Sequence, residues 1–138
     1  MISIILGQKG SGKTKTLIDM VNEAGEKEHG TVVCIVQGNR HTHDLRPFVR
    51  LVDTSEFDLD SFKVFYGFIC GIISGNYDIS HIFIDSVTKI SNSNMDKFSG
   101  FLEYIEKLSN QFNIAFTMTV SAEMSEAPEG VKKYLINY

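Results

Sequence analysis

The sequence predicts an α/β protein whose mainly parallel sheet of about five strands carries helices on both faces. Continuous apolar runs at 2–6 and 31–36 are typical of strands buried on both faces of such a sheet. Between them, apolar residues recur every three or four positions over 13–24, which indicates an amphipathic helix. A helix between two such strands forms a βαβ unit with a right-handed crossover. The 138 residues predict a single domain, 1–138.

The same patterns predict the remaining elements. They are, in chain order, a short strand at 49–52, a helix at 61–74 capped by Asp60 or Ser61, a strand at 81–85, a helix at 95–108 capped by Ser93 or Asn94, a strand at 113–120, a short helix at 128–133 and an edge strand at 134–137. In the helix at 61–74, Gly67 and Gly71 lie on one side, and we expect them to allow close packing against the sheet.

Residues 7–14 read Gly-Gln-Lys-Gly-Ser-Gly-Lys-Thr, which matches the G-x-x-x-x-G-K-T pattern of a phosphate-binding loop, or Walker A motif. We expect Gly7 to let the chain leave the strand in a conformation that a Cβ would resist, and Gly12 to let the backbone approach phosphate oxygens. Backbone N–H groups between them would form an anion-binding nest beside the positive end of the helix dipole. The alternative is a glycine-rich turn that binds no ligand.

Within this motif, Lys13 is expected to reach the β- and γ-phosphates, and the Thr14 hydroxyl is expected to bind Mg²⁺. Lys13 is also a predicted catalytic residue, because its charge would stabilise the reacting phosphate. The predicted nucleotide-binding residues are Gly7, Gln8, Lys9, Gly10, Ser11, Gly12, Lys13, Thr14 and Lys15.

The run His-Ile-Phe-Ile-Asp at 81–85 is a second motif, because an apolar strand that ends in an acid has the Walker B pattern. Asp85 would hold the water shell of the Mg²⁺ that Thr14 also contacts. The alternative is an Asp that ends the strand and caps the next turn. On the strand at 113–120, Thr119 and the following Ser121 are candidate sensors of the terminal phosphate, although threonine is also simply a good strand former.

Residues 37–48 show no periodicity and are rich in polar groups, so we expect a loop. All three arginines lie in it or just beyond it: Arg40, Arg46 and Arg50. The segment leaves the carboxyl end of a strand, where open α/β sheets bind ligands. It is therefore either a basic loop that contacts phosphate, base or nucleic acid, or a solvated surface whose charges balance nearby acids. His41 and His43 have metal-pair spacing, but the sequence places no third ligand.

Composition excludes several functions. A net charge of −4 argues against a broad nucleic-acid or membrane-surface interface. Cys34 and Cys70 each lie alone in apolar runs, which is typical of reduced core cysteines in a cytoplasmic protein. Met1 directly precedes the first strand, so we expect no signal peptide, and no apolar run is long enough to span a membrane.

The two motifs in this order, followed by the strand at 113–120, resemble the RecA-like branch of P-loop NTPases. The matching positions are Gly7, Gly12, Lys13, Thr14 and Asp85. The resemblance implies a three-layer P-loop fold with strand order 5-1-4-3-2, in which the strand at 113–120 lies between the Walker A strand and the Asp85 strand. The whole chain also looks like small bacterial proteins that carry a generic ATP-binding label or a name borrowed from the much longer pilus-retraction ATPases.

The chain departs from the RecA-like pattern at the glutamate that polarises water in those ATPases, because Ser86 stands beside Asp85. Glu56 and Glu123 are the nearest candidates by topology, and Glu56 is a predicted catalytic residue. The guanine-reading N-K-x-D sequence and an arginine-bearing lid are both missing, which favours ATP over GTP and hydrolysis over phosphate transfer to a small molecule.

We therefore expect a protein that binds Mg-ATP and hydrolyses it slowly or only with a partner. In the RecA-like strand order the second strand lies several strands from Walker A, so an arginine such as Arg40 would act from another subunit of a homo-oligomer or a protein partner. The alternatives are a nucleotide-binding switch that does not hydrolyse ATP, in which nucleotide sets the shape of 37–56, and a small-molecule kinase.

Overall fold

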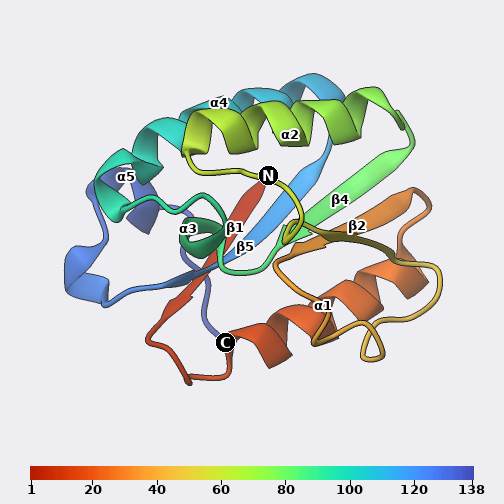
Figure 1. The fold of residues 1–138 in the computed structure, drawn as a ribbon, viewed down its shortest axis with the longest axis horizontal. Coiled ribbons are helices and arrows are strands. Elements are labelled where there is room, and N and C mark those ends of the chain that lie inside the picture. The colour runs from red at the N-terminus through yellow and green to blue at the C-terminus, as the bar shows by residue number, and fades with distance from the viewer.

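The computed structural model describes residues 1–138, in which strands and helices alternate along an α/β chain (Figure 1). Its elements are β1 (Ile2–Gly7), α1 (Lys13–Lys27), β2 (Thr31–Val36), β3 (Arg50–Asp53), α2 (Phe62–Ser74), β4 (Ile79–Ile84), α3 (Val87–Ile90), the 3-10 turn η1 (Met95–Lys97), α4 (Phe98–Phe112), β5 (Ala115–Ser121), the 3-10 turn η2 (Met124–Glu126) and α5 (Glu129–Lys132). The predicted strands and long helices are all present except the edge strand at 134–137, and only α3 and η2 had no predicted counterpart.

All five strands are parallel, in the order β1-β5-β4-β2-β3. The expected order 5-1-4-3-2 is therefore wrong. The strand β3 pairs with the outer edge of β2 and does not separate β2 from β4, while 134–137 forms only an isolated bridge between Ile4 and Leu135. The strand β5 does lie between β1 and β4, as the RecA-like resemblance implies.

Helices cover both faces of the sheet and make three layers, with α1 on one face and α2 and α4 on the other (Figure 1). The larger core, of 26 buried residues, lies under α2 and α4, and a smaller core of 8 residues lies under α1. Alternate strand residues enter each core. On β5, Phe116, Met118 and Val120 all belong to the larger core.

The helix α2 begins as predicted, because the side chain of Ser61 caps it by accepting a hydrogen bond from the Val64 nitrogen at 3.1 Å. The expectation for its two glycines is wrong. Gly67 and Gly71 lie on the exposed side, and a Cβ on either would meet no atom within 4 Å. They do not serve close packing against the sheet. None of the helices is both long and apolar enough to span a membrane.

The last residues run along the free edge of β1. The Ile4 nitrogen donates to the Tyr134 carbonyl at 2.8 Å, and the Ile136 nitrogen donates to the Ile4 carbonyl at 2.9 Å. This pairing carries Tyr138 to the loop that follows β1, where its hydroxyl lies 2.8 Å from the hydroxyl oxygen of Ser11. The C-terminal segment thus covers one side of that loop.

Candidate functional site

A cavity of about 660 Å³ lies at the carboxyl ends of the strands. Its walls come from the loop of residues 7–14 (the glycine loop) with the start of α1, from the end of β2 and the loop after it, from the turn after β4 with α3, and from Ser121 at the end of β5. Residues far apart in the sequence meet here, because the carboxyl ends of neighbouring parallel strands share one edge of the sheet. The cavity brings together Lys13, Thr14, Arg40 and Asp85.

The glycine loop uses its glycines for two different reasons. Gly10 and Gly12 have φ angles of 86° and 89°, a left-handed conformation that side chains other than glycine rarely adopt. The backbone of Gly7 is not left-handed. A glycine is required there because a Cβ would collide with the hydroxyl groups of Tyr138 and Ser11. The loop closes on itself where the Ser11 nitrogen donates to the Gln8 carbonyl at 3.1 Å.

Lys13 is almost fully buried, with 6% of its surface exposed. Its ammonium group donates to the Gln8 carbonyl at 2.9 Å, so the side chain folds back over the glycine loop. A buried cation stays charged only where it is paired or hydrogen-bonded, and here a single carbonyl supplies that contact. The positive charge is thereby held against the loop and toward the cavity that Lys13 lines.

Asp85, directly after β4, is the centre of a hydrogen-bond network. Its carboxylate accepts a hydrogen bond from the Thr14 hydroxyl, whose oxygen lies 3.1 and 3.2 Å from the two carboxylate oxygens. It also accepts one from the Thr119 hydroxyl at 2.7 Å, and that hydroxyl in turn accepts from the Ser86 nitrogen at 2.7 Å. The structure thus brings together Thr14 and Asp85, the two residues that the sequence motifs predicted to lie near the same Mg²⁺.

The two candidate sensors on β5 have different surroundings. Thr119 is fully buried behind Asp85 and does not line the cavity, so its hydroxyl orients the carboxylate. Ser121, two residues further on, is exposed and does line the cavity. Asp85 also acts on the buried thiol of Cys34, whose pKa rises to about 12 because of burial and, secondarily, the charge of Asp85. That thiol is therefore unreactive at neutral pH.

Arg40 lines the same cavity as the glycine loop, which corrects the expectation that strand order would keep it away. The difference has a structural cause, because β2 lies next to β4 and the first residues of the loop after β2 line the cavity together with the turn after β4. Asp53 at the end of β3 holds that loop, accepting hydrogen bonds from the nitrogens of Gly38 at 2.7 Å and Ser55 at 2.9 Å. These two donors, with Ser55 the stronger, lower the pKa of Asp53.

The other two arginines do not line the cavity. Arg46 lies 3.7 Å from the carboxylate of Glu26, and both groups are more than half exposed. Arg50 is exposed at the start of β3. Both arginines are therefore exposed on the surface, away from the cavity.

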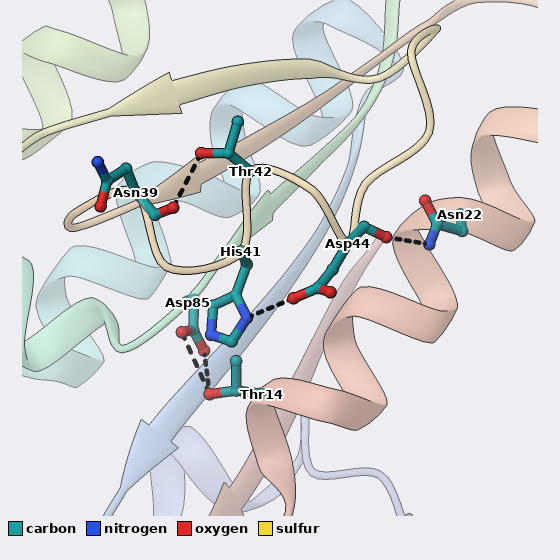
Figure 2. A network of polar contacts seen from close by, with 7 residues as sticks. All are labelled: Thr14, Asn22, Asn39, His41, Thr42, Asp44 and Asp85. Carbon is teal, nitrogen blue, oxygen red and sulfur yellow. Dashed lines mark hydrogen bonds and ion pairs between the residues drawn. The ribbon is translucent and has the colours of Figure 1, made fainter.

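His41 also lines the cavity, although the sequence suggested for it only metal binding together with His43. Its Nδ1 lies 3.0 Å from a carboxylate oxygen of Asp44. Figure 2 shows this contact with Asp44, whose carbonyl in turn accepts a hydrogen bond from Asn22 of α1. His41 and Asp44 are three residues apart in a loop that follows a buried strand. This spacing is the sequence signal that could have identified the pair.

Neither predicted glutamate lines this cavity. Glu56 is exposed in the turn after β3, at the outer edge of the sheet. Glu123 accepts a hydrogen bond from Gln8 at 3.0 Å and lines a separate, more open hollow on the other side of the glycine loop. The structure therefore does not bring Glu56 to the remaining predicted site residues.

The cavity can attract and hold an anion. Five cationic side chains line it, namely Lys9, Lys13, Lys15, Arg40 and Lys89, and Asp85 is the one carboxylate among the lining residues. The paired oxygens of Asp85 and Thr14 are of the kind that Mg²⁺ prefers. No group of three or more His, Cys, Asp or Glu side chains is arranged to bind a metal by itself. A cation here would complete its coordination with water or with oxygens of a bound anion.

Comparison of the chain with models of known protein families finds no match, and no curated protein sequence is significantly similar to it.

Proposed function

We propose that the protein binds a nucleoside triphosphate, ATP, together with Mg²⁺ in the cavity above the glycine loop. The observation that carries this proposal is the contact between Thr14 and Asp85 at 3.1–3.2 Å, directly beside the loop and the buried Lys13. It joins two motif residues 71 positions apart in the sequence. A glycine-rich turn that binds no ligand would not require this contact between Thr14 and Asp85.

Three features of the glycine loop support a bound phosphate chain. Left-handed glycines turn backbone N–H groups to one side, which produces an anion-binding nest. The loop leads directly into α1, a helix of 15 residues whose N-terminus carries a partial positive charge. The five cations of the cavity contrast with the net charge of −4 for the whole chain, so positive potential is concentrated at the proposed site.

For the metal ion, Thr14 would supply a hydroxyl ligand and Asp85 a carboxylate that binds directly or through water. Mg²⁺ supplies positive charge that offsets the negative charge of the phosphates. Thr119 keeps the carboxylate oriented from behind. Lys13 would leave the Gln8 carbonyl for the terminal phosphate when a nucleotide occupies the cavity.

We further propose that the bound ATP is hydrolysed slowly. Arg40 lines the cavity in the same chain, so its charge is available to the terminal phosphate without a second subunit. A switch that does not hydrolyse ATP is the second candidate, and one observation favours it. The loop carrying Arg40 and His41 forms one wall of the cavity, and a nucleotide would contact it directly.

Titration calorimetry with ATP and Mg²⁺ tests binding. Lys13→Ala is expected to weaken ATP binding at least tenfold while leaving the unfolding midpoint within a few degrees of wild type. Lys132→Ala is the matched control, because Lys132 pairs with Glu129 on α5 away from the cavity. Equal ATP affinity in wild type and Lys13→Ala would refute the proposal.

A phosphate-release assay and hydrogen exchange separate the two candidates. Steady release of phosphate by wild type, lost in Lys13→Ala, supports hydrolysis. Tight binding without release, accompanied by slower exchange over residues 37–48, supports the switch.

A further inference from the structure

We propose that His41, oriented by Asp44, accepts the proton of the water that attacks the terminal phosphate of the bound nucleotide. This inference rests on the proposed function. It concerns the one step for which no predicted residue lies in the cavity, because Ser86 occupies the position after Asp85 and neither Glu56 nor Glu123 lines the cavity.

The geometry of the ring suits a proton acceptor. Nδ1 lies 3.0 Å from a carboxylate oxygen of Asp44. In the tautomer that donates its Nδ1 proton to this carboxylate, the lone pair of Nε2 is unshared. The imidazole side chain is 28% exposed, which leaves it accessible from the cavity that it lines. The ring lines the same cavity as Asp85 and Thr14, and Figure 2 shows its contact with Asp44. A water molecule beside the terminal phosphate would lie in this same space.

The pair is held by the helix that begins at the glycine loop. Asn22 of α1 donates to the Asp44 carbonyl at 3.0 Å and accepts from the Arg46 nitrogen at 2.9 Å. The Asp44 nitrogen donates to the His41 carbonyl at 3.0 Å, which closes a turn around the two side chains. Thr14 and Asn22 lie about 12 Å apart along one rigid helix, so the phosphate loop and the histidine keep a constant separation.

The charged groups that contact the ring or line the cavity with it are mostly cations. These groups are Asp44 on its own loop, Arg40 beside it, Lys9, Lys13 and Lys15 of the glycine loop and α1, Asp85 after β4, and Lys89 of α3. The lysines and Arg40 are cations, and Asp85 already accepts hydrogen bonds from Thr14 and Thr119. Among the groups that line the cavity, His41 is the one with an unshared ring nitrogen.

The chemical step balances without a further reactant. The water oxygen forms a bond to the γ-phosphorus, and the bond from that phosphorus to the β-γ bridging oxygen breaks, leaving its electron pair on ADP. The water proton moves to Nε2 of His41, and the Asp44 carboxylate stabilises the imidazolium that forms. The imidazolium then releases the proton to phosphate or solvent, so the products are ADP, inorganic phosphate and one proton.

Three variants test the inference under saturating ATP and Mg²⁺. His41→Ala is expected to lower kcat by about 100-fold, the usual contribution of a general base, while calorimetry shows an ATP affinity within about twofold of wild type. Asp44→Asn tests the positioning residue, because an amide cannot stabilise the imidazolium. It should lower kcat without changing affinity. His43→Ala is the control, since His43 is an exposed residue of the same loop that does not line the cavity.

Two further readouts distinguish proton transfer from a structural role. Added imidazole should restore part of the activity of His41→Ala and none of that of Lys13→Ala. The dependence of kcat on pH should differ between wild type and His41→Ala and should be the same in wild type and His43→Ala.

The possible failures are distinguishable. If wild type does not bind ATP, the proposed function itself is wrong. If wild type binds ATP but does not hydrolyse it, the proposed hydrolysis and this inference both fail and the switch is supported. If wild type hydrolyses ATP but His41→Ala turns over like His43→Ala, the inference alone is overturned.

Discussion

The hydroxyl of Thr119 joins two groups at the end of β4, donating to the Asp85 carboxylate at 2.7 Å and accepting from the Ser86 nitrogen at 2.7 Å. The contact from the Ser86 nitrogen is at the short end of the normal range, and the contact to Asp85 has the usual length of a hydroxyl hydrogen bond. Ser86 has a left-handed backbone with φ 59°, which is uncommon for a residue with a side chain. A residue on one strand thus fixes both the orientation of Asp85 and the turn that follows it.

The first prediction concerns this hydroxyl. Thr119→Val keeps the shape of the side chain but leaves the Ser86 N–H without its acceptor and removes a donor from Asp85. The free energy of unfolding is expected to fall by about 1–3 kcal/mol, as for other buried polar groups that lose a partner. Urea denaturation measures it. Thr119→Ser retains the hydroxyl and should lose less stability than Thr119→Val. A valine variant as stable as wild type would contradict the role assigned to Thr119.

The second prediction concerns the exposed glycines of α2. Gly67→Ala should raise the free energy of unfolding by up to about 1 kcal/mol, because alanine favours the helix and its Cβ meets no neighbouring atom. Gly12→Ala has the opposite expectation, since its φ of 89° strains any side chain. Thermal or urea unfolding of the two variants should therefore move in opposite directions. Destabilisation by Gly67→Ala would show that this side of α2 is covered.

The third prediction is a pH dependence that arises from His81 on β4. Burial lowers its pKa below the ordinary value of 6.5, although Glu28, 2.9 Å from its Nδ1, opposes that shift. The unfolded chain then binds the proton more readily than the folded chain. Stability is therefore full above about pH 7 and decreases as the pH falls through 6.5 toward the lower folded pKa.

His81→Gln tests this linkage because glutamine does not titrate. Urea denaturation at pH 7.5 and pH 5.5 should show a larger loss of stability for wild type than for the variant. Equal losses in both proteins would assign the pH dependence to other groups.

The fourth prediction concerns the tie between β3 and the loop after β2. Asp53→Ala removes the acceptor for the nitrogens of Gly38 and Ser55, and stability should fall by about 1–2 kcal/mol, as for other hydrogen bonds to a charged group. Amide exchange at Gly38 and its neighbours should become faster. Asp58→Ala is the control, because Asp58 is an exposed acid of the following segment with no hydrogen-bond partner of its own. Unchanged exchange at Gly38 would show that Asp53 does not hold the loop.

Local patterns predicted most of the architecture. Apolar runs and helical periodicity located β1, β2, β4, β5 and the three long helices, because each element buries a face that its own sequence specifies. The pairing of Thr14 with Asp85 was also predictable, since two residues at the carboxyl ends of parallel strands approach one another whenever the strands are close.

What sequence patterns missed depends on tertiary contacts. The position of β3 at the outer edge is set by pairing with β2, and no residue of either strand specifies which side is free. The role of His41 depends on Asn22, which is distant in sequence and fixes the loop by two hydrogen bonds. Glu56 was predicted to lie near the site on the assumption that the strand before it is close to the Walker A strand. That strand is β3, which occupies the far edge of the sheet.

The position of β5 between β1 and β4 has a consequence for folding. On the ribosome β1 is made first, yet its neighbour in the sheet is the last strand, with Ile2 opposite Phe116. Until β5 is in place, β1 and the glycine loop have no connection through the sheet to Asp85. Parallel pairing over such a separation is slow, because the intervening chain must be ordered before the contact forms. The contact between Thr14 and Asp85 would then be among the last to form, so acquisition of nucleotide affinity would report completion of the sheet.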